Sequence, residues 1–126
     1  MRVAVITEEA PLPAGHYSQA IKAGDFIFVS GQIPIDLQTD DLIEGDIKSK
    51  TRLILRNIEA ILKAGDSSLS KVVKLTVFIK DLSDFPAVNS VFAEFFAGEP
   101  PARETVQVSK IPKDAEIEIS AIALAN

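Results

Sequence analysis

The sequence predicts an α+β domain in which two helices pack on one face of a mixed β-sheet. Three observations lead to this class. Two segments repeat apolar residues every three or four positions, several shorter segments are rich in β-branched and apolar residues, and helices alternate with strands only in part. With 126 residues and no linker or internal repeat, the chain is expected to form a single domain, residues 1–126.

Two short strands are expected towards the N-terminus, over Tyr17–Ala23 and Phe26–Ser30. The pair Gly24-Asp25 stands between these apolar runs and favours a tight hairpin turn. Gly31 should interrupt the second strand, and Pro34 makes its continuation an edge or a loop. An additional strand at the N-terminal end is left open, because that segment is only mildly apolar.

The clearest helix is expected over Ile47–Ala64. Asp46 is a suitable N-cap, and Gly65 stands where a left-handed residue commonly follows a helix. One apolar stripe at steps of three and four predicts the buried side of this helix. Its members are Ile47, Thr51, Ile54, Leu55, Ile58, Ile61 and Leu62.

The second half of the chain predicts one more helix among three strands. The expected elements are a strand over Val72–Lys80, a helix over about Phe85–Ala97 closed by Gly98, and strands over Arg103–Ser109 and Glu116–Leu124. Alternation along a strand should place Val73, Leu75, Val77 and Ile79 on one face of the first strand. In the last strand it should place Glu116, Glu118 and Ser120 on one face and Ile117 and Ile119 on the other.

Two helices can cover only one face of such a sheet. The other face would carry Val72, Thr76, Phe78, Ile122 and Leu124, with nothing in the chain to cover them. A partly apolar, uncovered sheet face on a small domain favours self-association.

Composition excludes several classes of function. Thirteen Lys and Arg against eighteen Asp and Glu give a net charge of −5, which argues against non-specific electrostatic binding of nucleic acid. The absence of cysteine excludes disulfides and thiolate chemistry, and His16 alone cannot build a histidine metal site. No apolar run approaches the roughly 20 residues of a membrane span and no signal-peptide pattern is present, so a cytoplasmic protein is expected.

Arg103 is the first candidate for binding chemistry. It follows Pro100, Pro101 and Ala102, so its guanidinium is presented from a stiff base, and the planar fork suits a small carboxylate. The alternative is an ordinary surface arginine. Asn89 stands within the second helix, either exposed or leaning towards a cleft.

Tyr17, Ser30 and Gly31 are further candidates. The Tyr17 hydroxyl could orient a substrate, although such a tyrosine often only packs. Ser30-Gly31 ends a strand where free backbone N–H groups could hold an anion or a water, unless Gly31 merely permits a bulge. From the residues alone, the sequence indicates a small, self-associating α+β domain that binds a small anion.

Four separated segments together resemble the RidA (YjgF/UK114) family of reactive enamine/imine deaminases. The resemblance covers essentially the whole chain. The segments are Gly15–Ala20, Val29–Pro34, Val72–Phe78 with Asp84-Phe85 and Asn89, and Pro101–Val108 with Ile111–Asp114 and Glu118-Ile119.

The resemblance implies a chorismate-mutase-like fold and a homotrimer whose sheets form a central β-barrel. It implies active sites in the clefts between subunits, where 2-iminobutanoate, 2-iminopropanoate and the related enamine 2-aminoacrylate are hydrolysed to 2-keto acids and ammonia. The imines are released by pyridoxal-phosphate enzymes. The deaminase itself needs no cofactor and no metal.

The same resemblance implies a role for each candidate. Arg103 would bind the substrate carboxylate, and Tyr17 would close the cleft and orient the substrate. Ser30 and Gly31 would supply polar contacts near the attacking water, and Asn89 would line the pocket.

Ser120 is where this sequence departs from the family. Typical members are taken to carry a Glu aligned with Ser120, which positions the water or protonates the leaving amine. Glu118, two residues earlier on the same face and roughly 6.5–7 Å away, is not an obvious substitute. This departure leaves open a non-catalytic binder of small 2-keto acids in the same trimeric cleft. An RNA-cleaving activity is the third reading, and the acidic balance counts against it.

Overall fold

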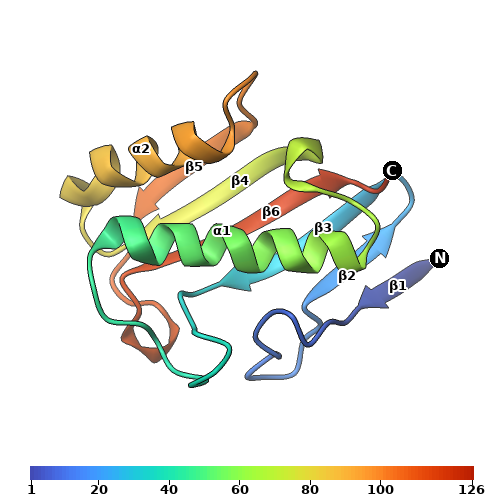
Figure 1. Cartoon of the computed structure of the whole chain (residues 1–126), viewed down its shortest axis with the longest axis horizontal. Helices are drawn as coiled ribbons and strands as arrows, with labels where there is room; N and C mark the ends of the chain where they lie inside the picture. The colour runs from blue at the N-terminus through green and yellow to red at the C-terminus, as the bar shows by residue number, and fades with distance from the viewer.

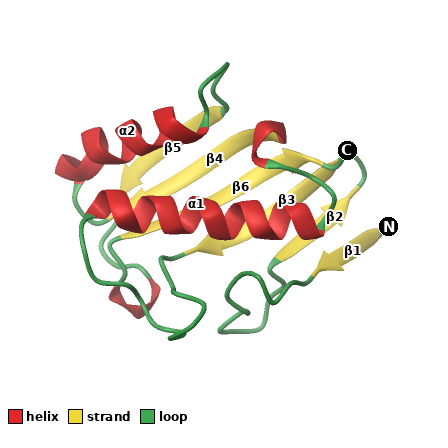
Figure 2. Ribbon diagram, in the orientation of Figure 1, coloured by secondary structure: helices red, strands yellow, loops and turns green.

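Six strands and two helices make up the computed structural model, which describes residues 1–126. The elements are β1 (Arg2–Val5), β2 (Ala20–Ala23), β3 (Phe26–Gln32), α1 (Ile47–Ala64), β4 (Val72–Ile79), α2 (Phe85–Phe95), β5 (Ala102–Gln107) and β6 (Ile117–Leu124). They build one sheet of order β1-β2-β3-β6-β4-β5 in which only β4 and β5 are parallel. Both helices lie on the same face of this sheet (Figures 1 and 2). The predicted α+β class with a mixed sheet is confirmed.

Helix α1 provides much of the core. Its N-terminus is capped as predicted, since the Asp46 side chain accepts a hydrogen bond of 2.8 Å from the Ser49 backbone N–H. The predicted stripe is buried against the sheet, and five of its aliphatic side chains are fully covered, each stabilising the fold by about 1.5–3 kcal/mol. These are Ile54, Leu55, Ile58, Ile61 and Leu62. Neither helix has the length and apolar content needed to cross a membrane.

The end of α1 differs from the prediction. Gly65 is the C-cap with a φ of −96°, so it is not left-handed, and Asp66 takes the positive φ of 63° instead. A Cβ atom at Gly65 would lie 2.9 Å from Cδ1 of Ile27. A larger residue at Gly65 would therefore have to displace the Ile27 side chain, because the helix end packs closely on β3.

The N-terminal strands are rearranged relative to the prediction. Residues 17–19 do not join β2, because the Tyr17 N–H donates to the Gly15 carbonyl over 3.0 Å and closes a bend. Strand β3 passes through Gly31 as far as Gln32, with an irregular register against β6 between Val29 and Gln32. The N-terminal segment left open by the sequence forms β1 and pairs with β2.

The predicted faces of β4 are wrong at its first two residues. Val72 is buried and Val73 is 37% exposed, because the register against β6 shifts between Val72 and Lys74. From Leu75 onwards the alternation is as predicted. The second helix ends at Phe95 with Phe96 as its C-cap, two residues before the predicted end.

The face of the sheet opposite the helices is open. Its most exposed large apolar side chains are Phe26 (41%), Phe28 (46%), Val106 (43%) and Leu124 (39%). Thr76, Phe78 and Ile122 are half-buried on the same face. Nothing in the chain covers this apolar surface, which is the reason to expect self-association.

Candidate active site

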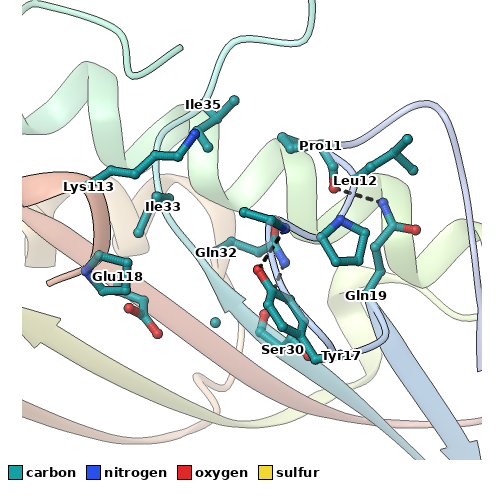
Figure 3. Close-up of a pocket in the computed structure, with 14 residues that line it drawn as sticks. Pro11, Leu12, Tyr17, Gln19, Ser30, Gln32, Ile33, Ile35, Lys113 and Glu118 are labelled. Carbon is teal, nitrogen blue, oxygen red and sulfur yellow. Dashed lines mark hydrogen bonds between the residues drawn. The ribbon is translucent and has the colours of Figure 1, made fainter. Parts of the chain in front are cut away.

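A cavity of about 320 Å³ lies where the irregular end of β3 meets the start of β6 and the loop after β1 (Figure 3). It brings together three residues singled out from the sequence, which are Tyr17, Ser30 and Gly31. It also contains Glu118 of β6, which the sequence analysis set aside. Pro11–Ala14 and Lys113 complete much of its wall.

Gly31 and Glu118 are in direct contact in this first pocket. A Cβ atom built on Gly31 would collide with the Glu118 carboxylate, so no larger residue fits here unless Glu118 moves. The carboxylate therefore lies directly over the backbone of the β3 irregularity. Burial raises the pKa of Glu118 above its ordinary value, which favours the exchange of a proton nearer to neutral pH.

Tyr17 and Ser30 shape the same pocket through the bend at residues 15–18. The Tyr17 ring is half-exposed, and its hydroxyl accepts a hydrogen bond of 3.3 Å from the Ala14 backbone N–H. The Ser30 hydroxyl donates to the Ser18 carbonyl over 2.6 Å. Since that hydroxyl proton is already used, Ser30 can offer a ligand only its oxygen lone pairs.

Gln19 is a structural residue of this pocket that the sequence analysis missed. It is 2% exposed, and its amide oxygen accepts from the Thr7 N–H over 2.8 Å. Its amide nitrogen donates to the carbonyls of Thr7, Ala10 and Pro11 at 3.0, 3.3 and 2.9 Å. One side chain thus fixes the loop that forms the pocket wall, and an isolated glutamine carries no sequence signal for this role.

A second cavity of about 390 Å³ lies between α2 and β5. It contains two of the three remaining predicted residues, Arg103 and Asn89, together with Phe92 and Pro101. The Arg103 guanidinium carbon lies 5.1 Å from the centre of the Phe85 ring and 5.2 Å from that of Phe92. The four ion pairs of the chain do not involve Arg103, so its fork is free to receive an anion.

Thr105 is a second residue that the sequence analysis missed. It lies two positions after Arg103 on β5, and therefore on the same face of the strand. Its hydroxyl oxygen is buried and has no hydrogen-bond partner in the chain. Thr105 does not line the cavity within this chain, but its hydroxyl can form a hydrogen bond with a ligand that extends past Arg103 along β5.

The two pockets cannot act on one small molecule within a single chain. Glu118 on β6 and Arg103 on β5 are separated by β4, and two strand spacings correspond to about 10 Å. Phe78 of β4 pairs with both Glu118 and Val106, which places Arg103 three residues further along. Arg103 faces the helices, whereas Glu118 alternates with the core residues and faces the open side.

Ser120 lies apart from both pockets. It lines a shallow depression on the open face with Phe28, Thr76 and Ile122. The pocket with Tyr17, Ser30 and Gly31 holds Glu118 instead, so Glu118, and not Ser120, stands where a carboxylate of the site would be expected. The reason is the irregular end of β3, because Gly31 approaches β6 beside Glu118, whereas Ser120 lies beside the regular pairing of Val29.

The comparison with known proteins is decided by a match that spans nearly the whole chain. A model of the family described as Endoribonuclease L-PSP (Ribonuc_L-PSP), which is the YjgF/RidA family, matches residues 7–125. The chain belongs to the RidA family.

Relatives in the RidA family are similar along their full length. A RutC family protein of Pyrococcus horikoshii is 54% identical over 123 residues, which is 98% of each chain. A 2-iminobutanoate/2-iminopropanoate deaminase of Dermatophagoides farinae is 39% identical, over 95% of this chain and 94% of that protein. The crystal structure of the E. coli YjgF gene product has a TM-score of 0.93 and 39% identity, covering 98% of this chain and 99% of that one. The fold is therefore the YjgF/RidA fold.

Proposed function

We propose that this RidA family protein hydrolyses small 2-imino acids, such as 2-iminobutanoate and 2-iminopropanoate, to 2-keto acids and ammonia. The observation that carries the proposal is Arg103, a half-buried guanidinium that opens into a cavity with no carboxylate partner of its own. Such a fork suits a bidentate pair with a small carboxylate. The name of the Dermatophagoides farinae relative supports the substrate class.

To hydrolyse an imine, the protein has to position the substrate and a water molecule and to transfer protons between them. Water attacks C2 of the imine, the new C–O bond forms, and the C=N π pair moves to nitrogen. Glu118 takes a proton from the attacking water and gives it to that nitrogen. In the second step the C–N bond breaks, ammonia leaves, and Glu118 carries the hydroxyl proton to the departing nitrogen while the keto group forms. The raised pKa of Glu118 suits both transfers, because one group must accept and then release a proton.

We propose that a complete site forms between two copies of the chain in a homotrimer. Arg103, Asn89 and Thr105 would come from one subunit, and Tyr17, Ser30, Gly31 and Glu118 from its neighbour. Two observations support this arrangement. The two half-sites face opposite sides of one sheet, and the open face is apolar enough to be covered by other copies.

The proposed activity is tested by coupling the protein to a threonine dehydratase, which releases 2-iminobutanoate, and by following ammonia and 2-ketobutyrate. The protein should raise the rate of imine hydrolysis above that in buffer. Calorimetry with 2-ketobutyrate separates the alternative of a non-catalytic binder, which would bind the keto acid without any rate. Tight binding of RNA at low salt would instead favour the nuclease activity in the family's description.

Thr105→Val should weaken substrate binding without weakening the fold. Valine has nearly the same shape and removes a buried hydroxyl that has no partner in the chain, so the Tm should be unchanged or higher. Loss of one hydrogen bond to a charged ligand should raise KM by about 10-fold or more. Steady-state kinetics and thermal unfolding check the two effects, and a lower Tm with an unchanged KM would contradict them. Thr76→Val, on the open face, is the matched control for the same change in side chain.

A further inference from the structure

We infer that Phe85 and Phe92 are positioning residues, here called the aromatic clamp, that hold the Arg103 guanidinium against their ring faces and leave its N–H donors free for the substrate carboxylate. The inference rests on the proposed function and adds the device that orients the binding group. Phe85 begins α2, and Phe92 follows two helical turns later on the same side of the helix.

The distances fit this role. A guanidinium within about 6 Å of a ring centre is attracted by the ring, and both distances here lie near 5 Å. Phe92 is 6% exposed and is itself held by an edge-to-face contact with Phe96 at 6.2 Å and 90°. Its position is therefore fixed before any ligand arrives.

Aromatic contacts can position an arginine without occupying the N–H groups that bind the substrate, whereas an acidic partner would occupy them. Elsewhere in the chain Arg52 is oriented by Glu94, which accepts two hydrogen bonds of 3.0 and 2.8 Å from it. A carboxylate of this kind next to Arg103 would occupy the N–H edge and compete with the substrate. The two rings attract the Arg103 guanidinium without accepting a charge-assisted hydrogen bond from it, so its N–H donors and its charge stay free.

The same helix offers a matched control. Arg56 lies over the Phe95 ring at 5.3 Å, a contact of the same kind. Phe95 contacts Arg56 and not Arg103, and neither Arg56 nor Phe95 lines the cavity that contains Arg103 and Phe92. Phe95→Leu therefore removes an arginine–aromatic contact from α2 and leaves the contacts of Phe85 and Phe92 with Arg103 intact.

The decisive variant is Phe85→Leu, because Phe85 is only half-buried and its loss should not unfold the protein. We expect the Kd for 2-ketobutyrate, measured by calorimetry, to rise about five- to tenfold, since an arginine–aromatic contact of this kind is lost. KM for the imine should rise by the same factor while kcat changes less than about twofold, as for an interaction made equally in the ground and transition states. Phe85→Tyr should restore both constants, and Phe92→Leu should act in the same direction with a lower Tm.

Phe95→Leu should leave Kd and KM unchanged. The proposed aromatic clamp is refuted if Phe85→Leu leaves Kd within twofold of the wild type, or if Phe95→Leu raises Kd by the same factor as Phe85→Leu.

A test that does not depend on activity is the NMR signal of the Arg103 Nε–H group in the ligand-free protein. Ring currents should displace that signal, and Phe85→Leu should return it towards the other arginines. If the wild type neither binds keto acid nor hydrolyses imine, the proposed function fails. The NMR comparison then decides the clamp alone, and a signal unmoved by Phe85→Leu refutes it.

Discussion

Arg103→Ala should lower kcat/KM for 2-iminobutanoate by about 10²–10⁴-fold, because it removes two charge-assisted hydrogen bonds to the carboxylate. The Tm should fall only modestly, since Arg103 forms no ion pair within the chain and loses only its contacts with Phe85 and Phe92. The coupled dehydratase assay measures the first effect, and thermal unfolding measures the second.

Two further arginine variants show whether the fall in kcat/KM depends on the planar guanidinium of Arg103 itself. Arg103→Lys keeps the charge but not the planar fork, so it should fall between the wild type and Arg103→Ala. Arg52→Ala removes a surface arginine of α1 that is paired with Glu94, and it should leave the kinetics unchanged. Wild-type rates in Arg103→Ala would mean that the substrate carboxylate binds elsewhere.

Glu118→Gln should lower kcat by about 10²–10⁴-fold, the usual contribution of a general acid–base group. The side chain keeps its shape over Gly31 but can no longer take up or release a proton. In the wild type, the acidic limb of the kcat profile should lie above the ordinary range of a carboxyl group, because burial raises the pKa of Glu118. Steady-state rates between pH 4 and 9 test both statements.

The stability of Glu118→Gln should change in the opposite sense to its activity. Because the pKa of Glu118 is raised in the folded state, the folded protein holds this proton more tightly than the unfolded chain, and ionisation of Glu118 costs stability. The cost is absent below the ordinary carboxyl pKa of about 4.3 and is complete above the raised pKa. Glu118→Gln should therefore melt at the same temperature as the wild type or higher at pH 7, and this gain should disappear as the pH falls below about 4.

Glu116→Gln is the control for both effects. Glu116 lies outside the Glu118 pocket and is bound by Lys50 at 2.7 Å. Loss of the Glu116 charge in this variant should leave kcat unchanged and should not raise the Tm. A kcat of Glu118→Gln within threefold of the wild type would remove Glu118 from the proton transfers.

Local patterns determined the parts of the fold that repeat. The period of apolar residues located α1, and Asp46 located its start, because both signals act within a few residues. Alternation in β6 correctly placed Ile117 and Ile119 in the core and Glu118 and Ser120 on the other face. The resemblance in the sequence also identified the family without any coordinates.

Pairing between distant strands decided the rest. The irregularity at Val29–Gln32 falls where Gly31 could permit a bulge, but its position against β6 is set by the pairing of the two strands. The shift at Val72–Lys74 arises from the pairing of β4 with β6, and no local pattern in β4 indicates it. The first irregularity brings Gly31 against Glu118 and leaves Ser120 outside the pocket.

The separation of Arg103 and Tyr17 into two pockets of one chain was likewise not contained in any local pattern, and only the family resemblance implied active sites between subunits. Whether Arg103 and Tyr17 lie near one another depends on strand order and on which side of the sheet each side chain faces. The sequence by itself determined the elements, the core stripes and the candidate residues, because these follow from short-range periodicity and side-chain chemistry. Only the tertiary structure decided which of those residues share a pocket, because that is set by contacts between strands far apart in the chain.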